Sequence, residues 1–264
     1  RHKALDRLRR DRTLATKLAA IRYEIDIPAE PDVEPRLAGD EPWPDERLRL
    51  LFTCCHPALA PESQVALTLK IICGLSTEEI ARAFLTPTPT IAQRLVRAKA
   101  KIRAAAIPYR IPDASEMPPR LDAVLATIYL VFNEGYAATT GAELIRRDLC
   151  DEAIRLARLL AARLAERGEE IWRAEAEGLL ALMLLHHARR AARVDERGTP
   201  ILLDAQDRRQ WDRAAIEIGL RLVERALRWG RPNPYAIEAA IAAVHARAER
   251  SEETDWRQIA DLYG

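Results

Sequence analysis

The sequence has 264 residues, of which 48% are hydrophobic. A chain of this length and apolar content can bury the core of one large or two ordinary domains, which excludes a disordered protein. Its 41 basic and 40 acidic residues leave a net charge of +1, which taken alone argues against a nucleic-acid partner. No apolar run reaches the ~20 residues that span a bilayer, so we expect a soluble protein without a membrane segment.

The first two segments differ sharply in charge. Residues 1–13 carry six basic and two acidic residues, a net charge of +4. Residues 23–46 carry nine acidic residues and one basic residue, a net charge of −8, with five prolines that forbid a continuous helix. We therefore expect residues 1–22 to be the end of a preceding domain and residues 23–46 to be an extended acidic linker. Because the chain starts at Arg1, we also expect it to be a piece of a longer protein.

Residues 75–85 have the pattern of a short capped helix. Ser76 can accept a hydrogen bond at the helix start, and Glu79, three residues later, completes a capping box. We expect the buried face of this helix to consist of Ile80, Ala81, Phe84 and Leu85. A proline-rich turn follows, and Thr88 as N-cap with Pro89 as the first helical residue predicts that a second helix begins at once.

The second helix separates apolar from basic residues. Between Thr90 and Arg110 the chain has six basic residues and no acidic one. Helical spacing predicts a buried stripe of Ile91, Leu95, Ala98 and Ile102. A basic amphipathic helix alone is more often a solvated surface, but the capped helix and proline turn before it favour a helix that enters the major groove.

The exposed side of this helix carries the candidate DNA-binding residues. Residues at the helix start would lie at base edges, and cations farther along would neutralise phosphates. The predicted base-edge residues are Thr88, Thr90, Gln93 and Arg94, with Arg94 or Arg97 suited to guanine and Gln93 to adenine. The predicted phosphate contacts are Lys99, Lys101 and Arg103.

A second proline cluster, between Pro108 and Pro119, separates the helix-turn-helix domain (47–107) from the C-terminal region (108–264). Helical spacing in that region predicts helices at about 119–134, 143–167, 170–195, 207–229 and 234–249, and a last one from near residue 255. The glycines expected to stop helices are Gly135, Gly168 and Gly230. Since no alternation of period two is present, the predicted fold is all-α: a helix-turn-helix domain, then repeat-like helical hairpins joined by short turns.

Metal and catalytic signatures are weak. Adjacent helical residues point about 100° apart, so neither Cys54-Cys55-His56 nor His186-His187 predicts a metal site. We expect Cys55 in the core beside Leu48, Leu51 and Phe52. The four scattered cysteines fit a reducing cytoplasm. The sequence has no glycine-rich phosphate loop and no hydrolase motif, so we expect no enzyme, no catalytic residue and no cofactor.

Two stretches resemble a known family. Residues 75–81 (LSTEEIA) and 90–99 (TIAQRLVRAK) resemble, in order and spacing, the minus-35-reading domain of extracytoplasmic-function sigma factors. Residues 2–10 (HKALDRLRR) resemble the end of the helix with which that family reads the minus-10 element. The resemblance implies promoter DNA and core RNA polymerase as partners. It also implies that most of the minus-10-reading domain is missing, so this piece would not melt a promoter alone.

The C-terminal region resembles one subgroup of that family, which carries a tetratricopeptide-like helical extension. The resemblance rests on residues 133–136 (NEGY) and 202–212 (LLDAQDRRQWD), and it implies regulation through a regulatory protein or an intramolecular contact. One hypothesis places a regulatory surface at Tyr136, Arg147, Asp207, Arg208 and Trp211. The other holds that Gly135 is a left-handed helix cap and that the charges around Trp211 form an intramolecular clamp.

Two further functions stay open. An ordinary helix-turn-helix regulator would need a dimerising surface and two half-sites about one helical turn apart. A helical-repeat adaptor, whose helix-turn-helix is only structural, would keep its DNA affinity when Arg94 and Arg97 are replaced.

Overall fold

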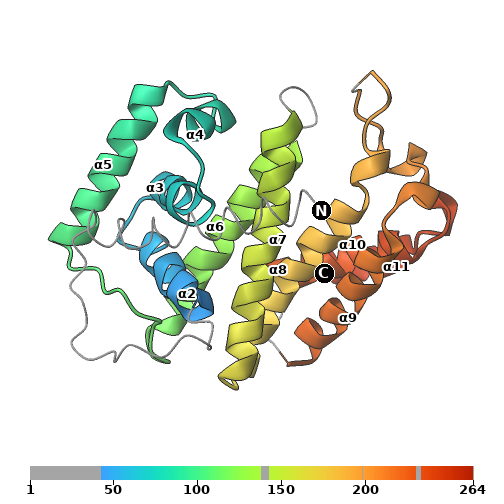
Figure 1. Ribbon diagram of the computed structural model, residues 1–264. Helices are drawn as coiled ribbons and strands as arrows, with labels where there is room; N and C mark the ends of the chain where they lie inside the picture. Colours follow the sequence, from blue (N-terminus) through green and yellow to red (C-terminus); the bar gives the residue numbers. More distant parts are fainter. Residues whose placement is uncertain (1–42, 138–142, 198, 230–232, 264) are drawn as a thin grey trace. The chain divides into compact units, whose positions relative to one another are not determined.

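The computed structural model describes residues 43–137, 143–197, 199–229 and 233–263 (Figure 1). Within these residues the fold is all-α, as predicted, and the one β contact is an isolated bridge between Val194 and Pro200. The predicted stub 1–22 and most of the predicted linker lie outside the described residues. No helix in the described ranges is both long and apolar enough to cross a membrane. The chain divides into two compact units, unit 1 up to Thr127 and unit 2 from Ile128.

Unit 1 holds the helix-turn-helix. Its described elements are α2 (Trp43–Cys54), α3 (Pro61–Leu67), a π-helical turn η1 (Thr68–Ile72), α4 (Thr77–Ala83), α5 (Thr88–Ala104) and the first half of α6 (Met117–Ala137). Both α3 and α4 pack on α5 (Figure 1). Because α2 begins at Trp43, the last four residues of the predicted acidic linker are helical.

Polar contacts tie the start of α6 to α2 and α3. Buried Arg120 donates from Nη2 to the carbonyl oxygen of Phe52 at 2.8 Å, near the end of α2. Thr127 donates from Oγ1 to Oε1 of Gln64 at 3.2 Å, and Gln64 donates from Nε2 to the carbonyl oxygen of Leu59 at 2.9 Å. Because these bonds hold the first half of α6 in unit 1, the compact units divide within α6, not at the proline cluster before it.

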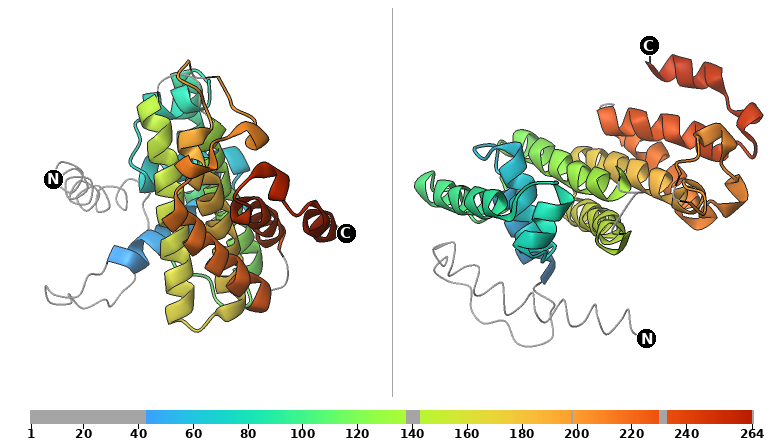
Figure 2. Two further views of the ribbon diagram at one scale, coloured as in Figure 1. Left: turned by 90° about the vertical axis from the view of Figure 1, so that its right-hand side faces the viewer. Right: turned by 90° about the horizontal axis from the view of Figure 1, so that it is seen from above.

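Unit 2 is organised around one buried helix. It contains the second half of α6, then α7 (Glu143–Glu166), α8 (Glu170–Ala188), η2 (Arg190–Ala192), η3 (Leu203–Ala205), η4 (Arg208–Gln210), α9 (Arg213–Trp229), α10 (Pro234–Arg247), η5 (Ser251–Glu253) and α11 (Trp256–Tyr263). Helix α8 contacts α7, α9 and α10 (Figures 1 and 2). Residues 176–185 of α8 are all buried, as expected for a helix that is enclosed on every side.

Two glycines let the helices around α8 approach closely. A Cβ atom on Gly219 of α9 would lie 2.8 Å from Cγ of Leu185, a distance that real Cβ contacts do not reach. A Cβ on Gly178 of α8 would lie 3.1 Å from both Cβ and the backbone nitrogen of Ala236 in α10. Both glycines lie inside helices, where they cost about 1 kcal/mol relative to alanine, so their contribution is close packing.

The three glycines predicted to stop helices have different outcomes. Gly135 lies within α6, which continues to Ala137, and its φ is not positive, so it caps no helix. Gly168 does stop α7: its φ is +70°, and the amide of Glu169 donates to the carbonyl oxygen of Leu164 at 2.9 Å. Gly230 lies outside the described residues.

The connection between α8 and α9 is longer than predicted. Helix α8 ends at Ala188, not near residue 195, and α9 begins at Arg213, not near residue 207. Side-chain acceptors organise this connection: Asp195 accepts from the amides of Arg197 and Thr199 within it, and Asp212 accepts from the amide of Ala215 at 3.1 Å in the first turn of α9. The short turns predicted for every hairpin are therefore wrong for this connection.

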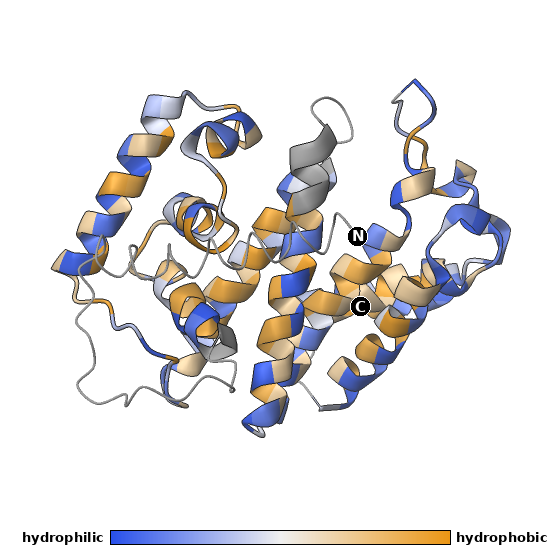
Figure 3. Cartoon of the chain, viewed as in Figure 1, coloured by the Kyte–Doolittle hydropathy of each residue, from blue (hydrophilic) through white to orange (hydrophobic). Residues whose placement is uncertain are grey.

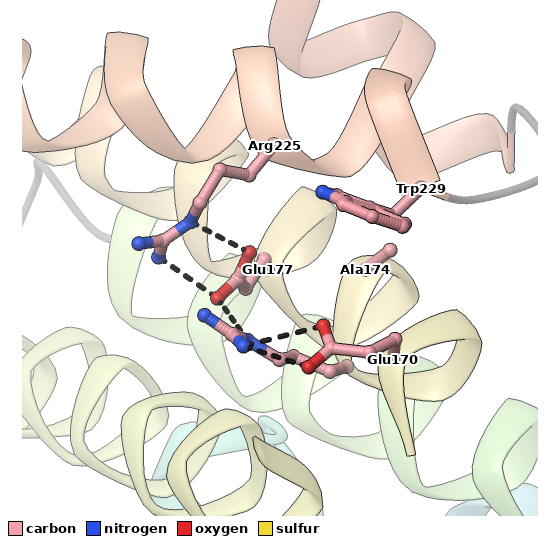
Figure 4. Close-up of a pocket in the computed structure, with 6 residues that line it drawn as sticks. Glu170, Ala174, Glu177, Arg225 and Trp229 are labelled. Carbon is pink, nitrogen blue, oxygen red and sulfur yellow. Dashed lines mark hydrogen bonds and ion pairs between the residues drawn. The ribbon is translucent and has the colours of Figure 1, made fainter. Parts of the chain in front are cut away.

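A buried carboxylate joins α8 to α9. The side chain of Glu177 is only 5% exposed, and Arg225 of α9 donates to both its oxygens, at 2.8 and 3.1 Å (Figure 4). Arg173 adds a bond from Nε at 2.9 Å. The adjoining hollow, which Trp229 also lines, measures about 40 Å³ and has room for a few water molecules, not for a ligand of ordinary size. This arrangement is a structural ion pair.

We predict that Glu177→Ala lowers the free energy of unfolding by about 2 kcal/mol in chemical denaturation. Removing one partner of a buried pair costs ~3–5 kcal/mol, and the cost is smaller here because Arg225 is about half exposed and stays solvated. The matched control is Glu170→Ala, since Glu170 is a more exposed partner of Arg173 and should change stability by less than ~1 kcal/mol. Equal losses in the two variants would refute the structural role of Glu177.

Candidate nucleic-acid interface

The first helix of the motif starts as predicted. Glu79 donates its amide to Oγ of Ser76 at 3.1 Å, and Ser76 donates its amide to Oε2 of Glu79 at 2.6 Å. This is a complete capping box at the start of α4. Ile80, Ala81 and Ala83 form the buried face of α4, which fixes this short helix against α5.

The turn after α4 differs from the prediction. Phe84 is the C-cap, and Leu85 follows with a φ of +49° and 88% of its surface exposed, so the prediction that Leu85 is buried was wrong. The amide of Thr86 donates to the carbonyl oxygen of Ala81, and the amide of Leu85 donates to the carbonyl oxygen of Arg82. These are the two hydrogen bonds of a Schellman motif. Glycine usually occupies this left-handed position because a side chain there costs ~1–2 kcal/mol.

Helix α5 begins one residue earlier than predicted. Pro87, with φ −56° and ψ 138°, is the N-cap, and its carbonyl oxygen accepts the first helical bond from the amide of Thr90 at 2.9 Å. Thr88 is thus the first helical residue and makes no capping hydrogen bond. Pro89 is the second, a position where its missing N–H would still have had no helical partner.

The two faces of α5 lie as predicted. Ile91, Leu95, Ala98 and Ile102 are buried and pack toward α3 and α4. The exposed side chains of the predicted set are Thr90, Gln93, Arg97, Lys101 and Arg103, and the half-buried ones are Thr88, Arg94 and Lys99. Figure 3 shows the two kinds of residue interleaved along α5. The burial of one side therefore presents all eight candidates at or near the surface.

Four of the five cations on this side of α5 have no ion pair in the described part of the chain. Within the described ranges, no ion pair involves Arg94, Arg97, Lys101 or Arg103. No acidic residue occurs on α5 itself. Cations with no carboxylate partner on an exposed helix generate the positive potential that attracts a polyanion.

Sequence reasoning missed two residues near this face. Arg82 is exposed on α4, and Val96, on α5 between the candidate cations, is 66% exposed. The only available signal was their position outside the apolar stripes, which marks exposure and not function. In helix-turn-helix proteins the first helix crosses the DNA backbone, a place that suits a cation such as Arg82.

Cys54 and Cys55 belong to the core of unit 1, as predicted for Cys55. Cys55 is fully buried, and burial raises the pKa of its thiol to about 11. Burial also raises the pKa of Cys54 well above its usual range. His56 accepts a hydrogen bond from the amide of Ala58 at 3.1 Å. The described part of the chain contains no group of three metal-ligating side chains.

The predicted regulatory surface is only partly a surface. Arg208 is 5% exposed and Trp211 is 3% exposed, so neither lines an exposed face, and the intramolecular contact is the better description of both. The guanidinium of Arg208 lies over the Trp211 ring, 4.9 Å from its centroid. Asp207 and Tyr136 are half-buried, and the side chain of Arg147 lies outside the described residues.

Comparison with known proteins agrees with this geometry. Residues 49–102 match the family described as Sigma-70, region 4, and residues 120–227 match a family of unknown function (DUF6596). The chain is 47% identical over 266 aligned positions to an uncharacterized protein of Rhizobium meliloti (strain 1021). That alignment covers all of this chain and 60% of the relative. No solved structure matches the chain. Residues 49–102 thus form a helix-turn-helix domain of the sigma-70 region 4 type, and further helices follow it.

We predict that Leu85→Gly raises the free energy of unfolding by roughly 0.5–1 kcal/mol in chemical denaturation. Glycine relieves the left-handed strain, part of this gain is offset by the freer unfolded chain, and little burial is lost. The matched control is Leu85→Ala, which removes the same exposed side chain but keeps the strain. A gain for alanine equal to that for glycine would show that the strain is not the cause.

Proposed function

We propose that this chain acts in transcription initiation as part of an alternative sigma factor of the extracytoplasmic-function class. In this proposal α5 enters the major groove of the minus-35 promoter element, and the region 4 domain helps to recruit core RNA polymerase. The chain itself catalyses no reaction. One observation carries the proposal: the side-chain amide of Gln93 and the cations of α5 are accessible on the side opposite its buried stripe, within a domain that matches sigma-70 region 4.

The proposed contacts follow position along α5. Thr88, Thr90, Gln93 and Arg94 occupy its first two turns and would contact base edges. Arg97 lies one turn farther along and would contact a guanine or a phosphate. The proposed phosphate contacts are Lys99, Lys101 and Arg103, together with Arg82 from α4. Val96 adds an exposed apolar side chain that suits a thymine methyl group.

The region beyond α5 is proposed to be regulatory. Residues 120–227 match a family without an assigned function, so the tetratricopeptide-like subgroup remains a proposal that rests on the residues around Tyr136 and Trp211. The burial of Arg208 and Trp211 makes them part of the scaffold of unit 2. A regulatory contact would therefore use groups around them that reach solvent.

The first test replaces Arg94 and Arg97 with alanine, singly and together, and measures binding to promoter duplexes by fluorescence anisotropy. Each bidentate arginine contact to a base is worth ~1–3 kcal/mol, so each loss should weaken binding by roughly 5- to 150-fold. The matched control is Arg158→Ala, which removes the same charge from an exposed position on α7. Unchanged affinity in the double variant would support the adaptor function instead.

A second test uses core RNA polymerase. Pull-down of core polymerase by the chain is expected for a sigma factor and not for an ordinary repressor or activator. The longer natural protein should also initiate transcription with core polymerase on some members of a promoter library. The proposed function is defeated if the chain does not capture core polymerase and the longer protein initiates transcription on no member of the library.

A further inference from the structure

Three arginines of unit 2 gather where helices end. Arg193 donates from Nη1 to the carbonyl oxygen of Tyr136 at 2.7 Å, in the last turn of α6, and its guanidinium lies 3.5 Å from the centroid of the Tyr136 ring. Arg189 directly follows the last residue of α8 and donates from Nη2 to the hydroxyl of Tyr136 at 3.1 Å. The guanidinium carbons of Arg189 and Arg208 lie over the Trp211 ring, at 6.0 and 4.9 Å from its centroid. We call these five residues the arginine cluster.

The arginine cluster contains no carboxylate. None of the ion pairs within the described ranges involves Arg189, Arg193 or Arg208. Three nearby acidic side chains pair with other arginines: Asp207 with Arg209, Asp212 with Arg190 and Glu253 with Arg250. The charges of Glu252 and Glu253 act on Arg208 without forming an ion pair with it. Three positive charges therefore lie together, partly buried, and none of them has a carboxylate within ion-pair distance in the described part of the chain.

Helix ends offset only part of this charge. Arg193 caps α6, Arg189 follows α8, and Arg208 donates from Nη1 to the carbonyl oxygens of His245 and Ala248 at the end of α10. Each helix C-terminus is equivalent to about half a negative charge. Three such ends compensate at most roughly 1.5 of the three positive charges, so they do not neutralise the cluster.

The arginine cluster also has hydrogen-bond donors to spare. Nε of Arg208 and Nε1 of Trp211 are buried and have no hydrogen-bond partner. Within the described ranges, Arg189 donates hydrogen bonds only from Nη2, and Arg193 only from Nη1. Their other guanidinium nitrogens have no hydrogen-bond partner there and are accessible to solvent. All these groups are donors, so what the cluster lacks is an acceptor. An unpaired buried donor costs ~1–3 kcal/mol, so an acceptor would stabilise the cluster.

The neighbouring histidines respond to the same positive field. Nδ1 of His186 lies 2.6 Å from Nη2 of Arg189. Burial, followed by the charges of Arg189 and Arg193, lowers the pKa of His186 to about 3. Burial and the charges of Arg189 and Arg208 also lower the pKa of His245. The His186 ring is therefore neutral near pH 7, and the shift of His245 also favours its neutral form.

We propose that the arginine cluster binds an oxyanion, the phosphate or carboxylate group of a small ligand. Arg189 and Arg193 supply donors that reach solvent, and Arg208 and Trp211 form the buried floor. A planar guanidinium matches the oxygens of phosphate and carboxylate, and two or more of them around one anion give charge-assisted bonds. This site belongs to unit 2 alone and does not depend on promoter recognition.

The test titrates the whole chain with inorganic phosphate and, separately, with malonate, following the melting temperature at constant ionic strength set with chloride. A saturable rise with phosphate or malonate and none with chloride is expected, since a ligand that binds the folded state stabilises it. The relative response to the two probes identifies the preferred oxyanion. Arg193→Gln should weaken the apparent affinity at least tenfold. Arg190→Gln, the same change on an exposed neighbour paired with Asp212, should leave it unchanged.

A second readout guards against a variant that folds poorly, because Arg193 also caps α6. The ring signals of His186 in the unmodified chain should shift on addition of phosphate or malonate in NMR spectra, with the same saturation as the melting temperature. The proposal is overturned if neither oxyanion stabilises the chain beyond chloride and the His186 signals do not move. It is also overturned if Arg193→Gln and Arg190→Gln bind equally well.

Discussion

The burial of one apolar stripe on α5 is the constraint on which the proposed interface depends. Ile91, Leu95, Ala98 and Ile102 each lose nearly all their exposure, and burying side chains of this size contributes ~1.5–3 kcal/mol for each of the large ones. Because these residues share one side of the helix, its rotation about its own axis is fixed. The side-chain amide of Gln93 and the cations on the other sides of the helix must then face outward. Their orientation is determined by the burial of the neighbouring apolar residues. The capping box on α4 supports the arrangement by setting where the preceding helix begins.

Most of this interface could be predicted from sequence because its causes are local. A capping box needs two residues three positions apart, and an amphipathic stripe needs only helical spacing, so Ser76, Glu79 and the stripe of α5 were all confirmed. Leu85 was wrongly predicted to be buried because the helix pattern was continued two residues past Ala83, where α4 ends. A left-handed residue that is not glycine leaves no trace in the sequence, and only the backbone bonds of the Schellman motif reveal it.

Unit 2 was harder to predict because its polar contacts join residues that are far apart in the chain. Gly135 was expected to cap a helix, but α6 continues past it. Arg208 and Trp211 were candidates for an exposed surface, yet Arg208 reaches 37 residues along the chain to His245, and both side chains are buried. Nor could the pairing of Glu177 with Arg225 across two helices be predicted from spacing. In this unit the sequence predicted the helices and most of their ends well, but not the connection between α8 and α9 or the buried charges.

The outward face of α5 is central because it connects the fold of unit 1 to the proposed recognition of promoter DNA. The most direct measurement is selection of bound duplexes from a randomised DNA library by the chain, followed by sequencing. Reading of bases by one recognition helix predicts enrichment of a single short, uninterrupted motif. No enrichment over the starting library would contradict base reading by α5, and an inverted repeat with half-sites about one helical turn apart would indicate an ordinary dimeric regulator instead.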